Sequence, residues 1–237
     1  MNKQFDNIEK NPKAIDIHIN SKDWFNKNFA FNHNHNLKTI SVSLIIPSIS
    51  RKTGVENSIL QGVILNTLAG PQNSRLFKIL RQENGLIYDV YSGSYLAGNN
   101  FGYVYIEFSS DLKNIREILN IIFNEIKILP EVEEIKLIKK YLINRNNLVM
   151  DDPRDYFLDN LYALFYFKKL FLDNYYEKII EQIRREAIRN FIKTYWNLKK
   201  YKLIIQSNEK GVRFEDLRTS IFLGSPSFPF LFKFIDF

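Results

Sequence analysis

The chain has 237 residues, of which 45% are hydrophobic and 25% are charged, enough for one substantial domain or two small ones sharing a core. Its formal net charge of +7 permits an anionic partner, but the basic residues are spread along amphipathic segments and are expected on solvated helix faces. The absence of cysteine excludes disulfides and thiol nucleophiles. The polar N-terminus and the lack of a spanning apolar run favour a cytoplasmic protein with no membrane span.

The first predicted elements are strands and one apolar helix. Residues 14–19 alternate between apolar and polar types and are expected to form an edge strand. Residues 39–46 are β-branched and alternating, which predicts a strand that Pro47 ends. Residues 53–69 are mostly apolar and are expected to form a helix, and the glycine and proline that follow directly are expected to end it.

A short helix and a hairpin come next. The helix is predicted to reach about Glu83, where Gly85 stops it, and a strand is predicted from Leu86 to about Tyr95. This places Arg81 in the last helical turn and Tyr88 early in the strand. A glycine–asparagine loop then leads to a returning strand over residues 101–108.

The second half of the chain is predicted to be mainly helical. Ser110 or Asp111 is expected to cap an amphipathic helix that Pro130 ends, and a further helix opens at Glu131. An aspartate–proline pair starts the next one at Pro153. The remaining predicted elements are helices over residues 153–170, 174–183 and 185–196, followed by a strand over 201–206.

This order of elements predicts an α+β fold, a two-layer sandwich with a largely antiparallel sheet and helices on one face. We expect an N-terminal extension over residues 1–38, a single domain over 39–207 and a phenylalanine-rich tail over 208–237. Burying each tail aromatic is worth about 1.5–3 kcal/mol, so the tail is expected either to pack on its own domain or to dock on a partner.

The sequence lacks the residues of a self-contained hydrolytic site. It has three histidines: His18 stands alone, whereas His33 and His35 could form a metal pair if extended, but their asparagine-rich segment has no carboxylate at ligand spacing and is expected to be exposed. No H-x-x-E-H, H-E-x-x-H, G-x-S-x-G or phosphate-binding motif occurs. Tyr103 and Tyr105 alternate on one predicted strand, but helices are expected to cover a face of that sheet, so we expect no nucleic-acid partner.

Residues 68–92 resemble the second half of the pitrilysin-like metallopeptidases, a family that includes the mitochondrial processing peptidases. The matching pattern is Ser-Arg-Leu-Phe from Ser74, a helix ending in Leu-Arg at Arg81, and Gly-Leu-x-Tyr ending at Tyr88. The order of strands and helices on either side, over residues 39–207, agrees with one homologous half of such an enzyme. The family's glycine-rich loop is reduced here to residues 69–73.

The resemblance implies a half-enzyme whose zinc lies elsewhere. In the family, one half carries H-x-x-E-H and the other supplies an arginine and a tyrosine to the active site, which correspond here to Arg81 and Tyr88. These two residues, with Asn73 as a substrate contact, are the expected site, whereas Arg75 and Phe77 are expected to hold the helix against the sheet.

The implied protein is inactive alone and acts on peptides as the non-zinc subunit of a heterodimer with a zinc-motif chain. Alternatives are a catalytically inert structural or peptide-binding module of the same fold, and a homodimer of this half.

Overall fold

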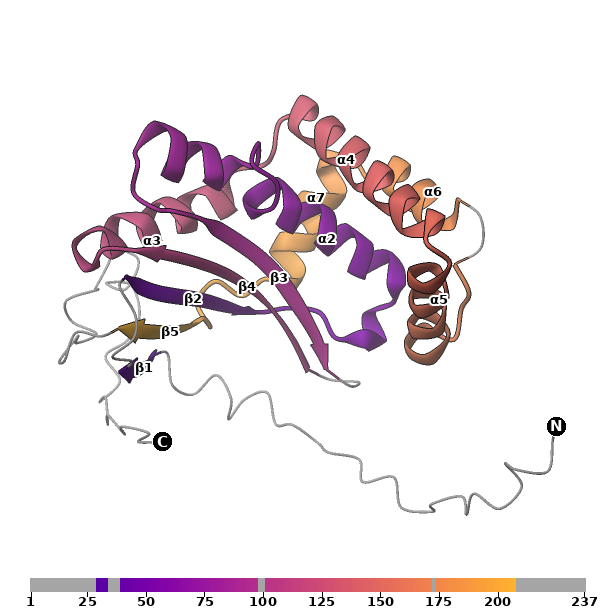
Figure 1. Ribbon diagram of the computed structural model, residues 1–237, viewed down its shortest axis with the longest axis horizontal. Helices are drawn as coiled ribbons and strands as arrows, with labels where there is room; N and C mark the ends of the chain where they lie inside the picture. The colour runs from indigo at the N-terminus through magenta and orange to yellow at the C-terminus, as the bar shows by residue number, and fades with distance from the viewer. Residues whose placement is uncertain (1–28, 34–38, 98–100, 172–173, 208–237) are drawn as a thin grey trace, which may run out of the picture.

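The computed structural model describes residues 29–33, 39–97, 101–171 and 174–207. A five-stranded sheet in the order β1-β5-β2-β4-β3 forms one layer (Figure 1). The strands are β1 (Phe29–His33), β2 (Ile40–Pro47), β3 (Val90–Ala97), β4 (Phe101–Ser110) and β5 (Lys202–Ser207). β1 pairs parallel with β5, and the other pairs are antiparallel, so the predicted largely antiparallel sheet is confirmed.

The helices form the second layer, on one face of the sheet (Figure 1). They are η1 (Arg51–Thr53), α2 (Val55–Ala69), η2 (Phe77–Glu83), α3 (Leu112–Lys127), α4 (Val132–Asp151), α5 (Pro153–Phe167), α6 (Tyr175–Gln182) and α7 (Arg185–Tyr195). Burial alternates along β4 accordingly: Val104, Ile106 and Phe108 are buried, whereas Tyr103 and Glu107 are not. The predicted α+β sandwich is therefore confirmed.

α2 lies at the centre of the helical layer. It contacts β3 on one side and α4, α6 and α7 on others, so it is apolar around most of its circumference. The Ser92 hydroxyl of β3 shares its one proton between the carbonyl oxygens of Leu65 and Ala69, the latter being a carbonyl that the end of α2 leaves free. The helix is thereby fixed to the strand that follows the candidate site.

Two of the predicted helix starts are confirmed by their hydrogen bonds. Glu131 and Glu134 form a reciprocal capping box at α4, and the Asp152 carboxylate accepts from the backbone N–H groups of Arg154 and Asp155 at α5. At α3 the N-cap position is Asp111, but no side-chain hydrogen bond caps this helix.

Of the first 38 residues, the structure describes only residues 29–33. The strand expected over residues 14–19 lies outside the described residues, as does the tail over 208–237. Residues 29–33, within the segment expected as an extension, form β1 and belong to the sheet. In the parts of the chain that the structure describes, no helix combines the length and apolar character needed to span a bilayer.

Candidate functional site

The candidate site starts on η2, a π-helical segment that directly follows two α-helical residues, Arg75 and Leu76. Leu76 and Leu80 are fully buried in the core and fix this helix to the molecule. Arg81 follows Leu80 directly and is exposed. π-helical turns are rare and are found often at functional sites, because the wider turn changes the direction of the side chains.

A tight turn joins η2 to the segment before β3. Gly85 has φ +60°, a left-handed conformation that glycine adopts readily and that ends helices. The Asn84 side-chain amide donates to the carbonyl oxygen of Ile79 at 2.7 Å, and the backbone N–H of Leu86 donates to that of Leu80 at 2.7 Å. Both bonds satisfy carbonyls that the end of the helix leaves free, as the predicted stop at Gly85 requires.

Arg81 and Tyr88 lie side by side across this turn. The Arg81 guanidinium donates to the backbone carbonyl of Ile87 at 2.9 Å, and its Cζ atom is 5.6 Å from the centroid of the Tyr88 ring. This distance is within the range of a cation–π contact. Tyr88 is 64% exposed, so its phenol and most of the five guanidinium N–H donors remain accessible to a ligand.

The C-terminal end of β4 holds the segment that carries Tyr88. The Ser110 hydroxyl donates to the carbonyl oxygen of Leu86 at 2.5 Å, instead of capping α3, and the backbone N–H of Tyr88 donates to Ser109 at 3.4 Å. The carbonyls of Leu86 and Ile87 accept hydrogen bonds from side chains, and regular pairing with β4 starts only at Val90, opposite Phe108. β3 begins at Val90, and the prediction of a strand from Leu86 is therefore wrong by four residues. The sequence suggested Ser110 only as a helix cap and did not reveal this role, which depends on a contact 24 residues away.

Asn73 does not join the pair. It is exposed in the turn before the helix, eight residues before Arg81 in the sequence. Neither Arg81 nor Tyr88 bonds to it. The structure therefore brings two of the three predicted site residues together and leaves the third in the turn that precedes Arg75.

Arg75 has a structural position, but it binds helices and not the sheet. Its guanidinium forms a fork with the Glu134 carboxylate of α4, at 3.1 and 2.7 Å, and donates to the carbonyl of Ile128 at 2.9 Å. The Glu125 carboxylate of α3 lies 3.5 Å away. Only 10% of the Arg75 side chain is exposed. Arg75 therefore joins the start of the site helix to α3 and α4.

The two carboxylates beside Arg75 have different pKa values. Burial raises the pKa of Glu125 above its ordinary value, and the guanidinium offsets this only in part. Burial also acts on Glu134, but the hydrogen bonds from Arg75 and from the Glu131 backbone outweigh it and lower the pKa of Glu134. Glu134 is consequently the principal ionic partner of Arg75.

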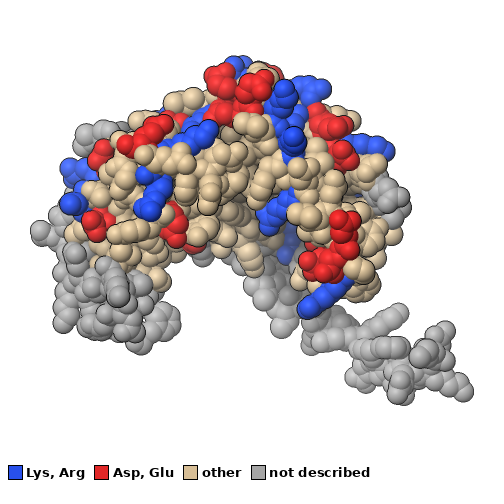
Figure 2. Space-filling model, turned by 45° about the horizontal axis from the view of Figure 1, so that its top comes forward, with Lys and Arg blue, Asp and Glu red and all other residues tan. Residues whose placement is uncertain are grey.

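The described residues do not fit a metal ion. No group of three or more histidine, cysteine, aspartate or glutamate residues in them could hold one. His33 lies in β1, whereas His18 and His35 lie outside the described ranges. Figure 2 shows acidic and basic side chains interspersed over the face that it draws, as expected for solvated helix faces.

The arrangement of the sheet and helices recurs in solved structures of peptidase-like proteins. The peptidase M16 inactive domain from Pseudomonas fluorescens superposes with a TM-score of 0.62 at 17% identity, over 79% of this chain and 45% of that one. A conserved protein from Enterococcus faecalis gives 0.65 at 18% identity, over 79% and 43%. The periplasmic protease PqqL from Escherichia coli gives 0.60 at 12% identity, over 77% and 21%. The chain spans less than half the length of each.

These likenesses show the fold, and the sequence shows the family. Residues 1–139 match the family described as the peptidase M16 inactive domain. The chain therefore belongs to the M16 (pitrilysin-like) peptidases, as a domain of the inactive type that lacks the zinc motif. No curated protein matches it.

Proposed function

We propose that this chain is the non-zinc subunit of a heterodimeric peptidase and supplies Arg81 and Tyr88 to an active site whose zinc a partner chain holds. The observation that carries the proposal is the exposed Arg81–Tyr88 pair, held at a fixed spacing by the Gly85 turn and the end of β4. Membership of the inactive M16 type supports a need for a second, zinc-bearing half. The division into residues 1–38, 39–207 and 208–237 remains part of this proposal.

The chemistry of the pair suits peptide hydrolysis. Attack of water on an amide builds negative charge on the carbonyl oxygen, and donors fixed in advance stabilise that charge without reorganising. Arg81 offers a permanent charge and several N–H donors, and Tyr88 offers a neutral O–H donor. Because Ile87 already holds one guanidinium N–H at 2.9 Å, the remaining donors of Arg81 have a fixed direction. In this proposal the zinc and the general base belong to the partner alone.

One observation favours an inert binding module instead. The contacts of Arg81 with the Ile87 carbonyl and the Tyr88 ring partly satisfy the guanidinium without any substrate. A module of this kind would keep the fold and hold a partner or a peptide without contributing to cleavage.

Mixing experiments separate the two functions. The isolated chain and an M16 chain bearing H-x-x-E-H from the same genome are assayed alone and together on a quenched-fluorescence peptide library, with light scattering to measure their masses. We expect no hydrolysis by this chain alone, a one-to-one complex, and activity in the mixture at least tenfold above that of the zinc chain alone. A complex whose activity equals that of the zinc chain would favour the inert module. A stable homodimer of this chain that excludes the zinc chain would rule out a heterodimer, whether this chain is catalytic or inert in it.

A further inference from the structure

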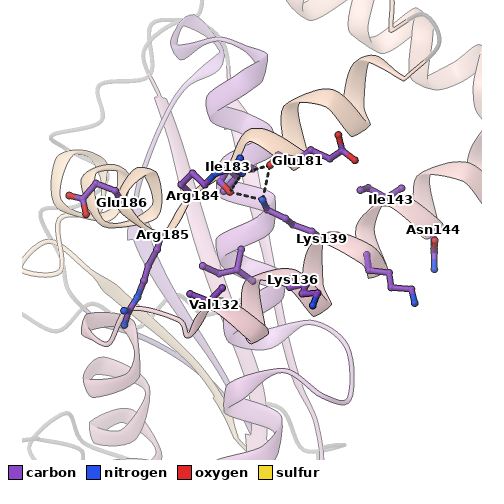
Figure 3. Close-up of a pocket in the computed structure, with 12 residues that line it drawn as sticks. Val132, Lys136, Lys139, Ile143, Asn144, Glu181, Ile183, Arg184, Arg185 and Glu186 are labelled. Carbon is purple, nitrogen blue, oxygen red and sulfur yellow. Dashed lines mark hydrogen bonds between the residues drawn. The ribbon is translucent and has the colours of Figure 1, made fainter.

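A groove of about 790 Å³ opens between α4 and the junction of α6 and α7 (Figure 3). One wall is a continuous stripe of α4 that runs from Val132 to Asn144, and the other is formed by Glu181 and residues 183–186. At about 1.5 Å per residue the α4 wall is roughly 18 Å long. An extended peptide rises about 3.3 Å per residue, so the groove suits a segment of five or six residues.

The groove has an apolar floor. Ile135 and Ile183 are each 6% exposed and form its base, and the more exposed Val132 and Ile143 extend this apolar surface along α4. A bare inorganic anion gains nothing from such a floor. Apolar side chains of a ligand would gain about 25 cal/mol for each Å² removed from water.

Basic side chains dominate the rim. Five lining residues are lysine or arginine and two are glutamate, namely Lys136, Lys139, Lys140, Arg184, Arg185, Glu181 and Glu186. The pairs Lys136–Glu133 and Arg185–Glu131 neutralise two of these cations, and the bond from Arg189 to Glu186 neutralises one of the two glutamates.

Three cations of the rim lie outside these ion pairs. The Lys139 ammonium donates to the backbone carbonyl of Glu181, at 3.0 Å, and to that of Ile183. The Arg184 guanidinium donates to the same two carbonyls. Burial first, and then the Arg184 charge, lowers the pKa of Lys139. Among the described residues, Lys139, Lys140 and Arg184 form no ion pair within 4 Å. Figure 3 shows Lys139 reaching across from α4 to the end of α6, with Arg184 beside it.

We propose that this groove binds an extended acidic segment of a partner polypeptide, whose apolar side chains pack on Ile135 and Ile183 while its carboxylates pair with Lys140 and Arg184. None of the lining residues is aromatic, so the groove offers no surface for stacking bases, and a polypeptide fits it better than a nucleic acid does. The groove shares no residue with the Arg81–Tyr88 pair, so this binding site stands whether or not the pair is catalytic.

Fluorescence anisotropy on the full chain tests the groove with three labelled octapeptides, which alternate glutamate with leucine, glutamate with serine, and lysine with leucine. We expect saturable binding of the glutamate–leucine peptide, with the other two at least fivefold weaker. Lys140→Glu and Arg184→Glu should each weaken its binding at least tenfold, and Val132→Ser at least threefold, because Val132 is an exposed part of the apolar surface. Lys199→Glu, a charge reversal outside the groove, should change binding less than twofold.

Within the part of the chain that the structure describes, the exposed Lys140 forms no hydrogen bond or ion pair, so its variant should fold normally, and thermal unfolding verifies this for every variant. Equal binding of the glutamate–serine peptide, or equal competition by single-stranded DNA, would show a general polyanion surface and overturn the proposal. So would the absence of saturable binding, or an effect of Lys199→Glu as large as that of Lys140→Glu.

Discussion

The guanidinium of Arg81 lies against the ring of Tyr88, with its Cζ atom 5.6 Å from the ring centroid. The two side chains come from either side of one turn, and each is accessible from solvent. The Ile87 carbonyl holds Arg81 by accepting a hydrogen bond from its guanidinium. The end of β4 holds the segment carrying Tyr88 through the bond from Ser110 to the Leu86 carbonyl. Two donors of different chemistry are therefore presented together by backbone that is held at both ends.

Substitutions at Tyr88 separate its hydroxyl from its ring. Tyr88→Phe keeps the ring that contacts Arg81 but removes the O–H donor, so we expect kcat/KM of the reconstituted pair to fall by about 10²-fold, as for loss of one oxyanion donor. Tyr88→Ala removes both and should reduce it further, because Arg81 also loses its cation–π partner. Steady-state kinetics on one peptide measure both variants. Wild-type turnover by Tyr88→Phe, with loss only in Tyr88→Ala, would assign the residue a positioning role.

Arg75 should matter for stability more than for binding. Arg75→Ala leaves the half-buried carboxylates of Glu125 and Glu134 without their cation, and breaking such a pair in a partly buried setting costs about 2–4 kcal/mol. Urea unfolding followed by circular dichroism measures this loss. Arg154→Ala, at an exposed position on α5, is the matched control and should change the unfolding free energy by less than about 0.5 kcal/mol. A loss of similar size in both variants would contradict the structural role of Arg75.

The stabilising effect of Glu134 should depend on pH. Its pKa is lowered in the folded protein below the ordinary value of 4.5, so the folded state binds this proton less readily than the unfolded state does. The resulting stabilisation is fully present above about pH 4.5 and is lost as the pH falls through the lower, folded pKa. The difference in unfolding free energy between wild type and Glu134→Gln should therefore shrink as the pH falls below about 4.5. A difference that stays constant over this range would show that the ionised carboxylate contributes nothing specific.

Two glycines should respond to alanine in opposite directions. A methyl group at Gly102 would overlap the backbone carbonyl oxygen of Ile49, so Gly102→Ala should destabilise the fold by about 3 kcal/mol. A methyl group at Gly62, inside α2, meets nothing within 4 Å, so Gly62→Ala should stabilise by about 0.5–1 kcal/mol through its higher helix propensity. Thermal unfolding of both variants measures the contrast. Equal effects of the two substitutions would mean that β4 can move away from the loop after β2.

The Arg81–Tyr88 turn could be predicted because its determinants are local. Gly85 ends the helix, and the spacing on either side is short, so the two residues had to approach one another. The start of β3 could not be predicted. Leu86 and Ile87 look like strand residues, but their carbonyls accept hydrogen bonds from the side chains of Ser110 and Arg81 and not from the backbone of β4.

Contacts between distant parts of the chain also escaped prediction. β1 and β5 pair although more than 160 residues separate Phe29 from Leu203, and neither strand marks the other as its partner. The basic groove likewise depends on Lys139 and Arg184, which lie 45 positions apart. Their sequence pattern predicts only that basic residues lie on solvated helix faces. Burial and hydrogen bonding place such residues, and a periodic pattern does not report them.

The central claim is that Arg81 and Tyr88 complete an active site on the partner chain. The most direct measurement is kcat/KM of the reconstituted pair carrying Arg81→Ala and Tyr88→Phe together, with Arg154→Ala and Tyr162→Phe together as the control and complex formation verified by light scattering. We predict a loss of at least about 10³-fold for the double site variant, because two donors to the developing oxyanion are removed, and less than a twofold change for the control. Activity of the site variant within threefold of wild type, in an intact complex, would contradict the claim.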